Sequence, residues 1–206
     1  MAGANKPRFV TLEGGEGVGK SSQLNTLSER LRKQGLDVVT SREPDGPIRD
    51  ILVTGDAQWQ PQTEALLHFA ARSEHLSNIV RPALASGTWV VCDRFADSTM
   101  AYQGIVQGAG IGFVDELYNL VVGDFAPDLT LILDLPFEIG LARAIERGTG
   151  EDRYERMGTE FHGKLRQAFI DIAANNTDRC VLIDANQPID GVGADIWQAV
   201  AGRFGF

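Results

Sequence analysis

Basic residues are scarce in this sequence. Among its 206 residues, 19 are Lys or Arg and 28 are Asp or Glu, which gives a formal net charge of −9. A protein that binds duplex nucleic acid normally carries a basic face, because it must replace the counterions along the phosphate backbone. The sequence has no long Lys/Arg cluster, so a nucleic-acid partner is not expected. Any anionic ligand should be small and bound by a few placed cations.

Cysteine and histidine are also scarce, with two and three copies. Cys92 and Cys180 both lie in apolar runs typical of strands, which predicts buried, reduced thiols rather than a disulfide. The histidines His68, His75 and His162 have no close Cys/His spacing. A zinc site is therefore not expected.

Long apolar runs are absent as well. The longest ones, such as residues 89–92, have the length of a strand, whereas a membrane-spanning helix needs about 20 apolar residues. The first nine residues contain no apolar stretch that resembles a secretory signal. These absences favour a cytoplasmic protein without a membrane partner. The length and the 43% hydrophobic content suit one α/β domain over residues 1–206.

What the sequence does contain is an alternation of short apolar runs with longer amphipathic ones, which predicts βαβ units and a parallel sheet. Leu24, Leu27 and Leu31 recur at helical spacing and predict an amphipathic helix that ends at Gly35. Further helices are expected from about 63 towards 85, after Pro136, and over about 191–201. The predicted strands cover residues 9–12, 38–40, 89–92, 129–133 and 181–183.

Two segments break this alternation. Residues 43–61 contain three prolines and two glycines, so we expect a loop with at most one or two helical turns. Residues 147–158 combine glycines with alternating charges and have little apolar content, which is typical of a mobile surface segment between two helices. We interpret residues 147–158 as a candidate lid.

A phosphate-binding loop follows the first predicted strand. Gly14, Gly19, Lys20 and Ser21 match the pattern G-x-x-x-x-G-K-[ST], between a strand and an amphipathic helix as that pattern requires. Glycines let backbone N–H groups converge on an anion, and the helix N-terminus adds partial positive charge. Lys20 is expected to bind the β- and γ-phosphates of ATP, and the Ser21 hydroxyl to ligate Mg²⁺. The predicted ATP-binding residues are Gly14, Gly15, Glu16, Gly17, Val18, Gly19, Lys20, Ser21 and Ser22.

A second polar cluster follows the strand at 89–92. Because ligands of open α/β sheets gather at the carboxyl ends of the strands, Asp93 should face the phosphate loop and bind the magnesium ion. Arg94 should place a cation beside the phosphates. Hydrogen-bonding side chains then follow in close succession, namely Asp97, Ser98, Thr99, Tyr102 and Gln103.

Five segments together resemble bacterial thymidylate kinases, which are P-loop nucleoside monophosphate kinases. They are Thr-Leu-Glu-Gly-x-Glu-Gly-x-Gly-Lys-Ser (11–21), Ser-Arg-Glu-Pro (41–44), Phe-Ala-Ala-Arg (69–72), Asp-Arg-Phe-x-x-Ser-Thr-x-Ala-Tyr-Gln-Gly (93–104) and Pro-Asp-Leu-Thr-Leu-x-Leu-Asp (127–134). The resemblance implies a three-layer P-loop fold with a five-stranded parallel sheet flanked by helices. It also implies Mg²⁺ dependence, a homodimer, and transfer of the ATP γ-phosphoryl group to thymidine 5′-monophosphate (dTMP), which gives dTDP and ADP.

The resemblance implies roles around the acceptor phosphate and sugar. Arg42 and Arg94 would hold the acceptor phosphate at in-line distance from ATP. Glu13 would contact the sugar 3′-hydroxyl or a metal-bound water. Tyr102 would lie under the deoxyribose and disfavour a 2′-hydroxyl.

It also implies roles around the thymine base. Phe69 would stack on the ring, and Arg72 would donate to a base carbonyl. The base edge would be contacted by Thr99 and Gln103, in a substrate site that also includes Ser98.

In this family the arginine that compensates transition-state charge comes from the phosphate loop or from the lid. Positions 15–18 contain no arginine, whereas Asp-Arg-Tyr-Glu at 152–155 resembles the lid motif of the second subtype. The resemblance therefore implies Arg153 as the catalytic cation, with Arg147 in support, beside Lys20 and Arg94. We interpret Arg156 as a solvated charge.

Two segments depart from the family pattern. The loop after Arg42-Glu-Pro is shortened and lacks the family's Gly-Gly-Thr, so its contacts with the acceptor phosphate stay open. Many relatives separate the stacking Phe from the Arg by four positions, whereas Phe69 and Arg72 are three apart and His68 occupies the four-residue spacing. Phe69 is the expected stacking residue, with His68 as the alternative.

Two other functions stay open. The first is a kinase for another (deoxy)nucleoside monophosphate. A deoxynucleoside acceptor is disfavoured, because it has no phosphate for Arg42 and Arg94 to bind. The second is a catalytically inactive nucleotide-binding regulator, which the shortened loop suggests and which the intact phosphate loop and Asp93 oppose.

Overall fold

The sheet at the centre of the molecule has five parallel strands in the order β2-β3-β1-β4-β5. The computed structural model describes residues 6–53, 57–147 and 153–206. Each predicted strand is present and is one or two residues longer than expected. The strands are β1 (Phe9–Glu13), β2 (Val38–Arg42), β3 (Trp89–Asp93), β4 (Leu129–Asp134) and β5 (Cys180–Asp184). The expectation of a five-stranded parallel sheet is therefore confirmed.

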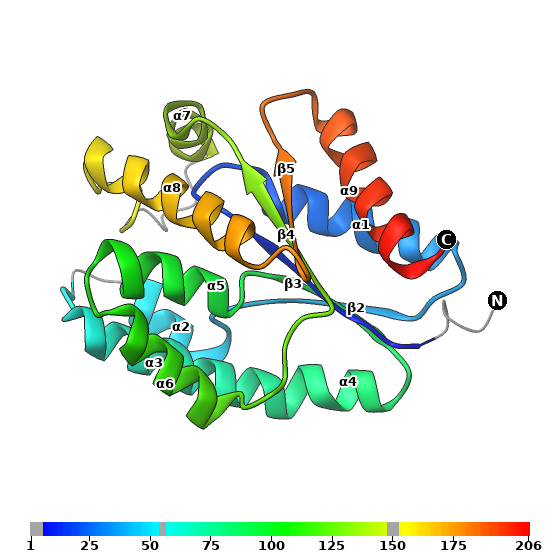
Figure 1. Ribbon diagram of the computed structural model, residues 1–206, viewed down its shortest axis with the longest axis horizontal. Helices are drawn as coiled ribbons and strands as arrows, with labels where there is room; N and C mark the ends of the chain where they lie inside the picture. Colours follow the sequence, from blue (N-terminus) through cyan, green and yellow to red (C-terminus); the bar gives the residue numbers. More distant parts are fainter. Residues whose placement is uncertain (1–5, 54–56, 148–152) are drawn as a thin grey trace.

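Helices cover both faces of the sheet (Figure 1). On one face α1 (Lys20–Lys33) and α9 (Ile189–Phe204) pack on alternate residues of the strands, such as Val10 and Leu12. The leucines Leu24, Leu27 and Leu31 of α1 are buried there, as their spacing predicts. The opposite face is covered by α3 (Pro61–His75), α4 (Arg81–Ala85), α6 (Ile111–Val121) and α8 (Thr159–Asn175). The molecule is thus a three-layer α/β/α fold.

The long helix expected from about 63 to 85 is present, although it is not uniform. It begins at Pro61 as α3 and continues through a π-helical stretch, η1 (Leu76–Val80), into α4. The stretch η1 ends two residues before Pro82, which has no N–H group to continue the ordinary helical ladder. A second π-helical stretch, η2 (Met100–Val106), follows the short helix α5 (Ala96–Thr99).

Two segments, 43–61 and 147–158, break the alternation of short apolar and amphipathic runs in the sequence. The segment after Pro44 forms α2 (Gly46–Val53), whose eight residues make about two turns, as expected. Helix α7 (Phe137–Arg147) precedes the candidate lid, and residues 153–156 of the lid form a turn before α8. Lid residues 148–152 lie outside the described part of the chain.

Both cysteines are buried and unpaired, as predicted. No helix within the described residues is long and apolar enough to cross a bilayer. The parallel strands β1, β2 and β3 end at the same edge of the sheet with Glu13, Arg42 and Asp93. Because strand ends at this edge are where α/β proteins bind ligands, the search for a site begins there.

Candidate active site

The phosphate-binding loop joins β1 to α1 and lies against α7. Gly17 has φ +66, and a Cβ atom at this position would lie 1.8 Å from the carbonyl oxygen of Gly140. Gly14, with φ +130, would place a Cβ atom 2.5 Å from the carbonyl oxygen of Leu133. Only glycine allows both the backbone turn and this close packing. The sequence pattern in this loop is therefore also a packing requirement.

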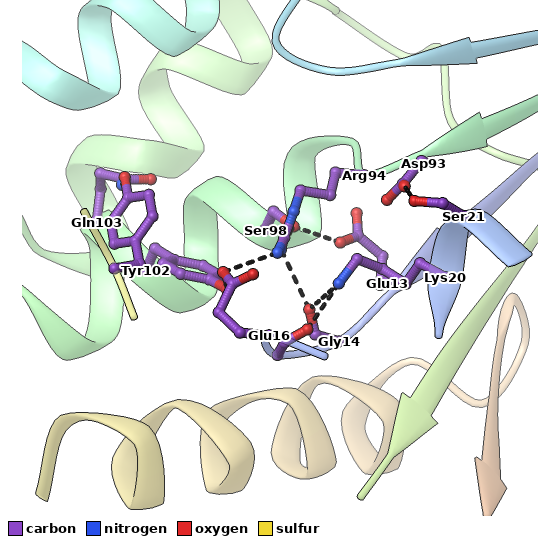
Figure 2. Close-up of polar contacts among 12 residues, drawn as sticks. Glu13, Gly14, Glu16, Lys20, Ser21, Asp93, Arg94, Ser98, Tyr102 and Gln103 are labelled. Carbon is purple, nitrogen blue, oxygen red and sulfur yellow. Dashed lines mark hydrogen bonds and ion pairs between the residues drawn. The ribbon is translucent and has the colours of Figure 1, made fainter. Parts of the chain in front are cut away.

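The ammonium group of Lys20 lies inside this loop (Figure 2). It donates to the carbonyl oxygens of Gly14 at 3.0 Å and Gly15 at 2.7 Å. Burial, and then the nearby charge of Arg94, lower the pKa of Lys20 to about 8. Phosphate groups bound in the loop would supply the negative charge that favours the protonated amine.

Ser21 and Asp93 form the pair that the sequence predicts for magnesium. The Ser21 hydroxyl donates to Oδ2 of Asp93 at 2.8 Å, so the first turn of α1 and the end of β3 meet here (Figure 2). Hydroxyl and carboxylate oxygens are the hard ligands that Mg²⁺ prefers, and Mg²⁺ usually completes its coordination with water and phosphate oxygens. The donor set at this point therefore fits the ion.

Arg94 is the centre of the polar network. Its φ of +71 is left-handed, which is rare for a residue with a side chain and often marks a functional site. One guanidinium nitrogen donates to the Gly14 carbonyl and the Ser98 hydroxyl, both at 3.1 Å, and the other donates to Glu16 at 2.9 Å. The Tyr102 hydroxyl donates to the same Glu16 oxygen at 2.6 Å. Arg94 thereby joins the phosphate loop to the helices after β3.

Glu16 is ionised and faces this network. Burial alone would raise its pKa, but the charges of Arg94 and Lys20 lower the pKa to about 2. The carboxylate is therefore an acceptor over the whole physiological pH range.

A cavity opens beside this network, lined by Glu16 of the phosphate loop and by residues of α2, α3, η2 and the lid. It brings together six of the predicted substrate residues, namely Arg42, Arg94, Ser98, Thr99, Tyr102 and Gln103. Four arginines line it, Arg42, Arg49, Arg94 and Arg153, against the two acids Glu16 and Glu43. The excess of guanidinium groups favours an anionic ligand.

Glu13 does not line the cavity, and its contact with the sugar 3′-hydroxyl or a metal-bound water stays a prediction. The side chain is fully buried, and its two carboxylate oxygens accept from the Phe95 N–H group at 2.7 Å and from the Ser98 hydroxyl. Burial, and then the charge of Asp97, raise the pKa of Glu13 to about 8. Glu13 therefore holds the turn after β3 in place, whereas Glu16 is the phosphate-loop acid that lines the cavity.

Phe69 does not line the cavity either, and its stacking on the base stays a prediction. It is 1% exposed and packs in the core between α3 and the sheet. His68, the alternative, lines the cavity. Neighbouring residues of a helix point about 100° apart, so a shift of one position decides which ring faces the ligand.

Arg72 lies in the wall behind the cavity. It is 1% exposed, its guanidinium packs 4.5 Å over the Phe69 ring, and it donates to Glu43 at 2.9 Å and to the Thr99 hydroxyl at 3.0 Å. Within the described parts of the chain, its buried Nη1 and the buried Nε2 of His68 have no hydrogen-bond partner. Two polar groups without a partner near one site are candidates for contacts with a ligand.

Two further residues of the site were not assigned a role from the sequence. Arg49 of α2 lines the cavity. Glu43 is buried and accepts from Arg72 at 2.9 Å and pairs with His75 at 2.8 Å. Glu43 belongs to the sequence motif at 41–44, which was recognised from the sequence. That motif does not predict which residues of α3 pair with Glu43.

The lid contributes Arg153 and Tyr154 to the cavity. Arg153 donates to the carbonyl oxygen of Leu52 in α2 and to Glu64 in α3, both at 3.0 Å. Arg147 is the last residue of α7, and its side chain lies outside the described part of the structure. The prediction that Arg153 is catalytic is not tested by this arrangement, which places its charge at the same cavity as Glu16 and Arg94.

Comparison with known proteins gives one consistent family. The family model described as thymidylate kinase matches residues 12–196. Thymidylate kinases from Magnetococcus marinus and Caulobacter vibrioides are each 48% identical over 203 residues, which cover 96% of this chain and 97% of the relative. The crystal structure of thymidylate kinase from Ehrlichia chaffeensis superposes with a TM-score of 0.74 at 32% identity, covering 94% of this chain and 98% of that one. The chain therefore belongs to the thymidylate kinase family.

Proposed function

We propose that this protein transfers the γ-phosphoryl group of ATP to dTMP, giving ADP and dTDP. The observation that carries the proposal is one cavity lined by four arginines together with Glu16 of the phosphate-binding loop. A nucleoside monophosphate requires cations for its phosphate at the point where the loop delivers the γ-phosphoryl group. The names of the curated relatives, at 44–48% identity over nearly the whole chain, support dTMP as the acceptor.

The proposed division of labour follows from the geometry. Lys20 and the backbone of the phosphate loop bind the donor phosphates. Arg42 and Arg94 bind the acceptor phosphate and bring two mutually repelling anions together. Arg94 suits this role because its contacts with Gly14 and Glu16 fix the guanidinium before the substrate arrives.

Mg²⁺ is proposed as the cofactor, with Ser21 and Asp93 as the residues that would hold it. When bound, the ion would supply positive charge that stabilises the charge developing on the phosphates. Asp93 already accepts from Ser21, so the chain presents both oxygens at one point.

For the base we propose contacts with His68, Thr99 and Gln103, and a donation from Arg72. Burial, and then the charge of Arg72, lower the pKa of His68 to about 3, so the imidazole is neutral at physiological pH. A neutral ring can stack on a pyrimidine or exchange one hydrogen bond with it. The unpartnered Nη1 of Arg72 suits a base carbonyl.

Oligomeric state, cellular location and domain organisation are also proposed from the resemblance to the family. We expect a homodimer, because the resemblance implies one and because Leu66, Ile111 and Leu120 are more than half exposed on α3 and α6, which pack together. The mass in solution measured by light scattering tests this. A cytoplasmic location suits the need for ATP. The chain is proposed to act as one domain with the lid at about 147–158.

A coupled assay of ADP release with ATP, Mg²⁺ and a panel of nucleoside monophosphates tests the proposed function. We expect dTMP to give the highest kcat/KM. Release with another monophosphate but not with dTMP would favour a different acceptor, and binding without turnover would favour a nucleotide-binding regulator.

Replacing His68 by alanine should raise the KM for dTMP about tenfold, because the side chain that contacts the base is lost. Phe69→Ala serves as the comparison. It should lower the melting temperature instead, since truncation of a buried Phe costs about 3–5 kcal/mol of stability. Steady-state kinetics and thermal unfolding of both variants measure the two effects. A larger KM increase in Phe69→Ala than in His68→Ala would return the base contact to Phe69.

A further inference from the structure

Glu64 is a buried acid that the proposed mechanism does not use. It lies in the first turn of α3 and is 0% exposed. A buried carboxylate is costly unless it is paired and fully hydrogen-bonded. The identity of its partners therefore indicates what Glu64 is for.

The partners of Glu64 come from the lid and from η2. Oε2 accepts from Arg153 at 3.0 Å. Oε1 accepts from Gln103 at 2.9 Å and from the Tyr154 hydroxyl. Gln103 also donates to the Tyr154 oxygen at 3.0 Å. Among the described residues, two of the three donors to this carboxylate thus belong to the lid.

The same contacts fix where the Arg153 charge lies. One guanidinium nitrogen donates to Glu64 and the other to the Leu52 carbonyl, so the group is held between α3 and α2. Tyr154 supports it, because its ring packs against Tyr102 at a centroid distance of 4.8 Å. Arg153, Tyr154, Leu52 and Gln103 all line the substrate cavity.

We infer that Glu64 is a positioning residue that docks the lid on the floor of the acceptor site and so places Arg153 at the cavity. If the lid moved away, Gln103 would be the one donor to the buried Glu64 side chain left among those the described residues supply. The docked lid is therefore favoured by the carboxylate before any nucleotide binds. Burial, and then the Glu64 carboxylate, raise the pKa of Tyr154 well above its usual value, so its hydroxyl stays protonated and keeps donating.

Limited trypsin digestion without nucleotide tests the docking directly. Cleavage after Arg153 and Arg156, identified by fragment mass, reports how often the lid leaves its docked position. In Glu64→Gln, which keeps the side-chain shape but removes the charge, these bonds should be cut about tenfold faster than in the unmodified chain, because hydrogen bonds to a charged group are lost. Glu74→Gln is the matched control on the same helix. Glu74 is exposed and accepts from Asn78 at 2.9 Å, so its replacement should leave the cleavage rate unchanged.

Tyr154→Phe keeps the ring and removes only the hydroxyl that donates to Glu64. It should speed cleavage about threefold, and it carries the test if Glu64→Gln does not fold. Unchanged cleavage in both variants, or in Tyr154→Phe when Glu64→Gln does not fold, would overturn the inference.

A kinetic test of Glu64 rests on the proposed function, whereas the proteolysis does not. A failure of the docking inference can therefore be distinguished from a failure of the proposed function. The kcat of Glu64→Gln should fall about tenfold, while the KM for ATP changes less than about threefold. Because Glu64 acts through Arg153, adding Arg153→Ala to Glu64→Gln should lower kcat no further than Arg153→Ala alone. If the losses of kcat in Glu64→Gln and Arg153→Ala were additive, the two residues would not share a role. If Glu64 were only structural, Glu64→Gln would lower the melting temperature, and its effect on kcat would not depend on Arg153.

Discussion

Replacing Lys20 by alanine should lower kcat about a thousandfold or more at saturating ATP and dTMP. The ammonium group is the full positive charge inside the phosphate loop, where the carbonyls of Gly14 and Gly15 hold it at 3.0 and 2.7 Å. Phosphoryl transfer depends mainly on positioning and charge stabilisation, so the loss of a phosphate-binding cation has a large effect on the rate. The coupled ADP-release assay measures it.

Lys33→Ala is the matched control for this experiment. Lys33 is the last residue of the same helix and is exposed, so its removal should leave kcat within about twofold of the unmodified chain. A loss below about tenfold in Lys20→Ala would contradict the assignment of Lys20 as the main donor-phosphate cation.

Arg153→Ala should also lower kcat about a thousandfold. Arg153 brings a guanidinium group to the cavity that Arg94 and Glu16 line, and positions 15–18 of the phosphate loop supply no arginine. An arginine that compensates the charge of the transferring group contributes about 10³-fold or more to the rate in related phosphoryl transfers. The measurement is kcat at saturating substrates, together with the KM for each.

Two further variants identify the source of that charge. Lys164→Ala removes a surface lysine of α8 that pairs with the exposed Glu160 one turn away, and it should leave kcat unchanged. Near-normal turnover in Arg153→Ala would move the catalytic role to Arg147 or Arg156, and the corresponding alanine variants would then show the loss instead.

The phosphate loop, the five strands and the Asp93–Arg94 step were all predictable from the sequence. Each is a local pattern, in which the residues that define the feature stand next to one another in the chain. The backbone turn and the close packing of the loop both require glycine at positions 14 and 17. The same residues therefore serve phosphate binding and the fold. For the same reason the sequence could place Ser21 and Asp93 at one edge of the sheet before their hydrogen bond was known.

Side-chain direction was harder to predict. Glu13 and Glu16 flank the same glycines, and both are acids that the sequence could assign to a substrate. The end of β1 turns Glu13 into the interior, where Phe95 and Ser98 satisfy it, while Glu16 faces the cavity. His68 and Phe69 differ in the same way, because the packing of α3 on the sheet decides which ring is buried.

By itself the sequence determined the phosphate-binding chemistry, the alternation that gives a parallel sheet, and the family. Only the tertiary structure decided that Glu64 and Arg153 meet, since 89 positions separate them along the chain. No local pattern encodes such a contact, because it depends on how α3, α2 and the lid pack around one buried carboxylate. The phosphate-binding loop is a local motif of neighbouring residues. The contact between Glu64 and Arg153, which places a lid arginine at the acceptor cavity, forms only when the chain folds.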